Sequence, residues 1–142
     1  MKTPIKFLHD CLLIKDTLVI GDLHIGYDEQ FHGKAMFPGM MIDNIKEKLD
    51  GVFDYLDSNN YKVKRIVLLG DVKHVFSQIT DIEWREVLSF FDFLKVRSRG
   101  AKLMIVKGNH DTILEPICRK RYIDLKEYYK IVIDGVKYCF LH

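Results

Sequence analysis

Short apolar runs along this chain are separated by polar breaks, by glycines and by two longer stretches of helical periodicity. The runs at 6–9, 11–14 and 17–20 follow one another closely, which is typical of strands at the start of a sheet. The later runs at 65–69 and 102–106 are almost continuously apolar, as expected for strands buried on both faces. These apolar runs therefore predict at least five strands.

Two helices are predicted between these strands. The first has apolar residues at helical spacing, at Ile42, Ile45, Leu49, Val52, Phe53 and Leu56. Thr80-Asp81-Ile82-Glu83 has the form of a capping box, so the second helix begins there and runs to about Arg97. The order strand, helix, strand, helix, strand predicts an α/β fold with right-handed crossovers and a largely parallel sheet.

A hairpin is predicted near the end of the sequence. Asp134-Gly135 separates the apolar runs at 129–133 and 136–141. The Asp-Gly pair suits a type I′ turn, which joins antiparallel strands tightly. Hairpin strands are thus expected at both ends of the parallel sheet.

Composition and charge narrow the classes of function only slightly. With 142 residues, of which 48% are hydrophobic, the chain can bury a core and forms one domain or part of a larger one. A net charge of +2 produces no strong global field, so nucleic acid is neither implied nor excluded as a partner. The basic positions within 62–65 and 119–121 are interpreted as solvated surface, with phosphate-backbone binding as the less common alternative.

Cysteine usage and hydropathy indicate a cytoplasmic protein. Cys11, Cys118 and Cys139 are odd in number, lack C-x-x-C spacing and lie in or beside apolar segments. We interpret them as buried thiols in a reducing compartment. The first residues lead into no long apolar segment, and no run approaches the about 20 apolar residues of a membrane span.

One small pattern occurs three times: an apolar strand, a glycine and then an oxygen-bearing side chain. It is found at Gly21-Asp22, Gly70-Asp71 and Gly108-Asn109. In an open parallel sheet, sites gather outside the carboxyl ends of the strands, so these side chains are expected at one edge. Histidines follow at short offsets, at His24, His74 and His110.

This mixture of imidazole and hard oxygen ligands is one that Mn²⁺, Fe or Zn²⁺ accepts. Each loop taken alone is also explained as an ordinary polar turn, since glycine, aspartate and asparagine are favoured there. The turn explanation does not require a histidine in every loop, so the joint pattern favours a metal centre. The absence of thiolates from the cluster argues against a closed structural zinc site.

The segments Asp22-x-His24, Gly70-Asp71 and Gly108-Asn109-His110-Asp111, in this order, resemble the signature of the calcineurin-like metallophosphoesterases. Residues 21–27 and 70–74 resemble more particularly an archaeal and bacterial branch that includes DNA-ligase-associated phosphoesterases. The resemblance implies a four-layer α/β/β/α sandwich. It also implies hydrolysis of phosphomonoesters or phosphodiesters by a hydroxide activated at two divalent metal ions, Mn foremost, with Fe, Zn and Ni as alternatives.

The resemblance assigns metal ligands residue by residue. The positions matching Asp22 and His24 bind the first metal, and the one matching Asp71 bridges both. The position matching Asn109 binds the second metal through its amide oxygen.

The resemblance assigns catalytic and supporting roles as well. The position matching His110 acts as an acid toward the leaving group, and Asp111 orients it. His74 either lines the substrate pocket or holds its loop.

The chain departs from the family pattern at its end. The family continues with a further histidine after a strand, which His142 matches, and then with a Gly-His-x-His segment that has no counterpart here. His142 is either a frayed terminal residue or a ligand of the second metal. We expect residues 1–142 to be a single domain without that last part. The last part, or self-association, would then cover the exposed apolar surface.

Two classes of function remain. The first is a metal-dependent phosphoesterase acting on a phosphate-ester substrate, for which the 142 residues alone could be inactive. The alternative is a non-catalytic scaffold or interaction module with the same fold. The unbroken set of matching ligands favours the enzyme, whereas the substrate and the native metal stay open.

Overall fold

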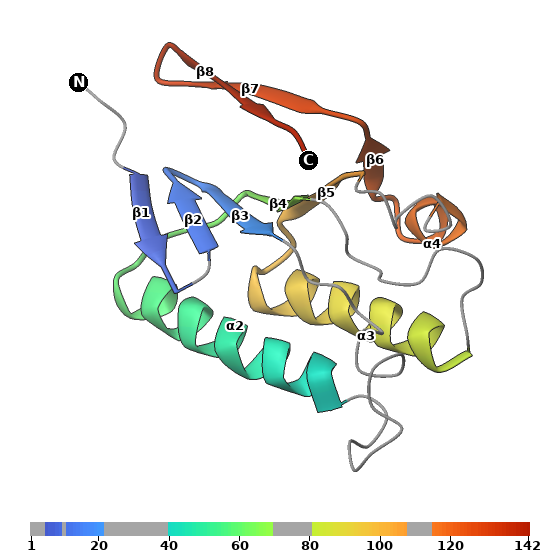
Figure 1. Ribbon diagram of the computed structural model, residues 1–142. Coiled ribbons are helices and arrows are strands. Elements are labelled where there is room, and N and C mark those ends of the chain that lie inside the picture. Colours follow the sequence, from blue (N-terminus) through green and yellow to red (C-terminus); the bar gives the residue numbers. More distant parts are fainter. Residues whose placement is uncertain (1–4, 10, 22–39, 70–80, 108–114) are drawn as a thin grey trace.

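The computed structural model describes residues 5–9, 11–21, 40–69, 81–107 and 115–142 (Figure 1). These residues form three layers. A helical layer covers one face of a six-stranded sheet, and a two-stranded sheet lies over the other face. Three of the four layers expected from the sequence are therefore present in the described part of the chain, in the order α/β/β.

The six-stranded sheet joins an antiparallel meander to a parallel array. Its strands, in spatial order, are β1 (Ile5–Leu8), β2 (Cys11–Ile14), β3 (Thr17–Gly21), β4 (Arg65–Leu69), β5 (Lys102–Val106) and β6 (Asp124–Lys126). The pairs β1–β2 and β2–β3 are antiparallel, whereas β3–β4, β4–β5 and β5–β6 are parallel. The predicted mixture of a parallel sheet with a hairpin at its start is confirmed.

Helices α2 (Met40–Ser58) and α3 (Asp81–Arg97) form the helical layer. Four of the periodic apolar residues of α2 are buried, as the sequence predicts: Leu49, Val52, Phe53 and Leu56. They share one core with the buried face of α3 and with side chains of the sheet. Ile45 is partly buried against the same core, and the side chain of Ile42 lies outside the described residues. Thr80, the first residue of the predicted capping box, lies outside the described residues.

Two elements were not predicted from the sequence: α4 (Glu115–Lys120) and β6. Helix α4 has only six residues, too few to show a helical period. Strand β6 has one apolar residue, Leu125, among its three. It becomes a strand by pairing with β5, and the Lys107 amide, just past β5, donates to the Lys126 carbonyl at 2.8 Å.

The predicted hairpin forms β7 (Tyr129–Ile133) and β8 (Val136–Phe140) as a separate two-stranded sheet. Its turn is as predicted, since Asp134 and Gly135 have positive φ angles of 51° and 79°. The buried side chains of the hairpin pack on those of β2 to β5 and form a second core: Ile131, Ile133 and Phe140 on Ile14, Val19, Val67, Met104 and Val106. The hairpin thus forms a second sheet that packs on the first.

The interpretation of the three cysteines was wrong for one of them. Cys11 and Cys118 are buried, but Cys139 is exposed. Cys139 pairs with Lys130 across the hairpin, and directly opposed residues of antiparallel strands share a face. The alternation of β8 therefore places Cys139 on the outer face, away from the core.

Both long helices end in the same backbone arrangement. The Tyr61 amide donates to the Leu56 carbonyl at 2.9 Å, and the Gly100 amide donates to the Lys95 carbonyl at 2.8 Å. These bonds close Schellman motifs, whose penultimate residue takes a left-handed conformation. Asn60 holds that position in α2 with φ 58°, and Arg99 holds it in α3 with φ 59°.

Arg99→Gly is expected to raise the free energy of unfolding by about 0.5 kcal/mol, because a residue with a Cβ is strained in the left-handed region. The ion pair that the change removes, Arg99 to Asp57 at 3.8 Å, is exposed and adds little stability. Urea unfolding measures the difference. Asn60→Gly serves as the control and should change stability less, because asparagine already tolerates this conformation. A loss of stability in Arg99→Gly would contradict the prediction.

Candidate functional site

Three of the strands that precede predicted metal ligands end at one edge of the sheet. The parallel register aligns Gly21 with Leu69, and Leu69 with Val106. Neighbouring strands lie about 4.8 Å apart, so these three ends span roughly 10 Å. We call this the carboxyl edge, and it is the edge at which ligands bind to open α/β sheets.

Most of the predicted site residues lie outside the described residues: Asp22, His24, Asp71, His74, Asn109, His110 and Asp111. In the sequence, Asp22 follows Gly21 directly, Asp71 comes two positions after Leu69, and Asn109 comes three positions after Val106. The structure thus brings together the strand ends that lead to these residues. The placement of their side chains stays a prediction.

His142 is the predicted ligand that the described residues include, and the hairpin directs it to the carboxyl edge. The hairpin turn is held at the opposite end of the sheet, where Asp134 Oδ1 lies 2.9 Å from Lys15 Nζ in the β2–β3 turn. Strand β8 therefore runs from there toward the carboxyl edge, and exposed His142 follows Phe140 off its end (Figure 1). This location suits a second-metal ligand, and that role stays a prediction.

The described groups with a shifted pKa lie away from this edge. Lys6 donates a hydrogen bond to the Tyr61 hydroxyl, which raises the pKa of Lys6. The hydrogen bond to Asp134 raises the pKa of Lys15 in the same way. Within the described residues, no group of three histidine, cysteine or acidic side chains is close enough to hold a metal ion. The predicted metal ligands other than His142 follow β3, β4 and β5 in the sequence, outside the described residues.

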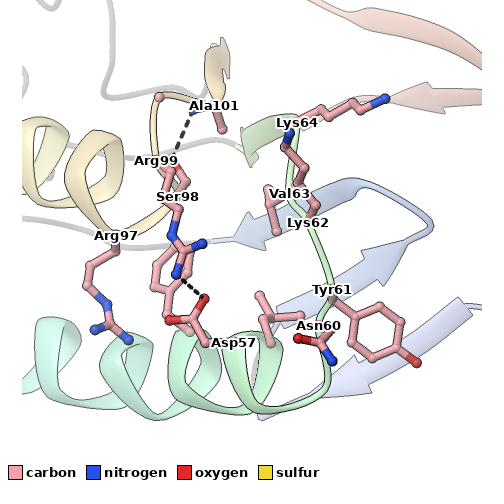
Figure 2. Close-up of a pocket in the computed structure, with 13 residues that line it drawn as sticks. Asp57, Asn60, Tyr61, Lys62, Val63, Lys64, Arg97, Ser98, Arg99 and Ala101 are labelled. Carbon is pink, nitrogen blue, oxygen red and sulfur yellow. Dashed lines mark hydrogen bonds and ion pairs between the residues drawn. The ribbon is translucent and has the colours of Figure 1, made fainter.

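A pocket of about 580 Å³ lies at the opposite edge, between the carboxyl ends of α2 and α3 (Figure 2). Its arginines are already paired within the fold. Arg97 contacts Asp50 at 3.3 Å and Asp54 at 2.8 Å, and Figure 2 shows Arg99 reaching Asp57. Helix carboxyl ends also carry partial negative charge. The pocket lies at the edge opposite to the strand ends that lead to the predicted ligands, so it is not part of the predicted metal site.

A second pocket, of about 540 Å³, lies at the carboxyl edge itself. It is lined by Lys107, Leu125, Lys126, Glu127, Tyr128, Tyr129 and Lys130. Lys107 directly follows the last residue of β5, and its amide bonds β6, so this pocket borders the strand end that leads to Asn109. This pocket was not predicted from the sequence, although the local run Lys-Glu-Tyr-Tyr-Lys mixes basic and aromatic residues in the way that nucleic-acid sites do.

Comparisons with known proteins agree with this architecture. The family model for the calcineurin-like phosphoesterases matches residues 16–140. No curated protein matches the chain significantly. Among solved structures, the fold is similar to that of the nuclease MPE from Pseudomonas putida, with a TM-score of 0.54 and 19% sequence identity over 82% of this chain. The chain spans 50% of the length of that protein. None of the described helices is long and apolar enough to cross a membrane.

Proposed function

Because this chain belongs to the calcineurin-like phosphoesterase family, we propose that it hydrolyses phosphate esters at a pair of divalent metal ions. The observation that carries the proposal is the register of β3, β4 and β5, which aligns Gly21, Leu69 and Val106 at the carboxyl edge. In the sequence, segments that contain the predicted ligands follow each of these strand ends.

The donor set fits a pair of such ions chemically. Asp22 and His24 would hold one ion, Asn109 and His142 the other, and Asp71 both. Oxygen and imidazole donors without thiolates accept Mn²⁺, which is our first candidate, and also Fe, Zn²⁺ or Ni²⁺. Asp71 is suited to a shared position because its carboxylate has two acceptor oxygens and a negative charge. An amide has one acceptor oxygen and no charge.

The remaining residues of the loops would act on the substrate and on its protons. When bound, the two ions offset the charge of the phosphate and supply hydroxide near neutral pH. His110 would donate a ring proton to the leaving-group oxygen, which prevents departure as a costly alkoxide. Asp111 would accept a hydrogen bond from the other ring nitrogen and so hold the imidazole in place. His74 would line the substrate or hold its own loop.

Metal removal tests the proposal directly. A protein that contains these residues, stripped with a chelator, is expected to lose hydrolysis of bis(p-nitrophenyl) phosphate, and added Mn²⁺ is expected to restore it. A diester is tested first because the solved protein of similar fold is a nuclease. Release of p-nitrophenolate is followed by absorbance. If none of Mn²⁺, Fe, Zn²⁺ and Ni²⁺ supports turnover, the enzyme proposal is wrong and the scaffold alternative is favoured.

A further inference from the structure

We propose that the pocket formed by Lys107 and residues 125–130 binds single-stranded nucleic acid beside the metal centre. We call it the lysine–tyrosine pocket. Its lysines would contact backbone phosphates, and Tyr128 would stack on a base. That the bound strand is a substrate rests on the proposed function. The binding itself requires neither metal nor turnover.

The position of the pocket is the first support. Val106 pairs with Lys126 at the ends of β5 and β6, and the next amide, that of Lys107, donates to the Lys126 carbonyl at 2.8 Å. Asn109 comes only two positions after Lys107 in the sequence. A polymer with one phosphate at the carboxyl edge would therefore place a neighbouring nucleotide at this pocket.

Charge is the second support. The pocket has three lysines, Lys107, Lys126 and Lys130, and one carboxylate, Glu127. Some basic side chains elsewhere in the described structure pair with acids, as Lys102 does with Asp124 at 3.3 Å. No such ion pair joins the pocket lysines to a carboxylate in the described ranges. Their charge is thus available to a polyanion.

The aromatic side chains are the third support. Tyr128 is 53% exposed, and Lys130 Nζ lies 5.4 Å from its ring centroid. Tyr129 stacks on Phe140 at 6.2 Å and so belongs to the wall of the pocket. An exposed aromatic ring between lysines is how proteins bind single strands without reading sequence, since every base has a face that stacks.

The same chemistry distinguishes nucleic acid from other phosphorylated partners. A terminal phosphate on a protein or small molecule is often bound in a bidentate manner by arginine, and no arginine lines this pocket. A volume of about 540 Å³ falls within the range typical of sites for small organic groups, about 300–1,000 Å³. The pocket can therefore accommodate a nucleotide, and Tyr128 gives its base a partner.

Binding of a fluorescein-labelled thymidine oligonucleotide, measured by fluorescence anisotropy in the presence of EDTA, tests the stacking contact. Tyr128→Ala is expected to weaken binding about tenfold, and Tyr128→Phe is expected to retain it because the ring is preserved. The matched control is Tyr122→Ala, since Tyr122 is 92% exposed after α4, at the opposite edge of the sheet. Its removal should leave the affinity unchanged.

Salt dependence tests the lysines in the same assay. Each phosphate contact contributes about 0.7 to the slope of log K against log salt for single strands, so Lys126→Gln with Lys130→Gln should lower the slope by about 1.4. Lys62→Gln with Lys64→Gln makes the same charge change at the opposite edge and should not alter the slope. Glu127→Gln is expected to tighten binding, because it removes the one carboxylate that lines the pocket.

The outcomes separate this inference from the proposed function. Unchanged affinity in Tyr128→Ala, or an unchanged slope in the Lys126 and Lys130 variant, would overturn the lysine–tyrosine pocket. Preference for a phosphopeptide over the oligonucleotide would overturn it as well. If the phosphoesterase proposal is wrong, the hydrolysis assay will show no metal-dependent turnover. The binding measured in EDTA does not depend on that result.

Discussion

Asp71→Asn is expected to abolish metal-dependent hydrolysis of bis(p-nitrophenyl) phosphate, with a fall in kcat of roughly 10³-fold, on the scale of other losses of transition-state stabilisation. The proposed role of Asp71 requires two oxygens and a negative charge between two cations. Asparagine keeps the size of the side chain but provides one acceptor oxygen and no charge. The variant should therefore lose metal affinity and activity together.

Metal content and kcat, measured on the same preparations, distinguish this from a folding defect. Asp92→Asn is the matched control, because Asp92 is an exposed residue of α3 that pairs with Arg121 at 3.2 Å. It makes the same chemical change away from the carboxyl edge and should leave kcat within about twofold. Wild-type turnover by Asp71→Asn would show that the bridging role is wrong.

Phe90→Ala is expected to lower the free energy of unfolding by about 3–5 kcal/mol. Phe90 is fully buried at 0% exposure, and its ring centroid lies 6.5 Å from those of Phe91 and Phe93. Its removal leaves a cavity in the core shared by α2, α3 and the sheet. Since the total stability of a domain is about 5–15 kcal/mol, this one change removes a large part of it.

Urea unfolding followed by circular dichroism measures the loss. Phe7→Ala is the control, because Phe7 is 81% exposed on β1 and its removal should cost less than about 0.5 kcal/mol. The loss of stability in Phe90→Leu should fall between those of Phe7→Ala and Phe90→Ala, and this variant keeps the protein folded for comparison. Similar losses in Phe7→Ala and Phe90→Ala would contradict the assignment of the core.

Local patterns in the sequence predicted the central strands and helices well. The runs at 65–69 and 102–106 form β4 and β5 with the predicted boundaries. Both are buried on both faces, so the apolar run and the strand coincide. The turn at Asp134-Gly135 was predictable for a similarly local reason, because its two residues tolerate positive φ.

Elements that depend on distant partners were not predictable in this way. Strand β6 has almost no apolar signal, and its extended state comes from the hydrogen bonds that β5 offers to it. The hairpin was expected among the strands at the ends of the parallel sheet, but it packs across the sheet as a second layer. This packing decides which face of the hairpin is buried, and the alternation along β8 then places Cys139 on the outer face.

The sequence by itself determined the family and the predicted ligands: three segments after strands, each with oxygen-bearing and imidazole side chains, in the order of the calcineurin-like phosphoesterases. Ligand type and turn chemistry are properties of adjacent residues, so they can be read along the chain. The tertiary structure alone decided the common register of Gly21, Leu69 and Val106 and the direction in which β8 carries His142. It also joined Lys107 to residues 125–130, because hydrogen bonding between strands and burial between layers act across long sequence separations.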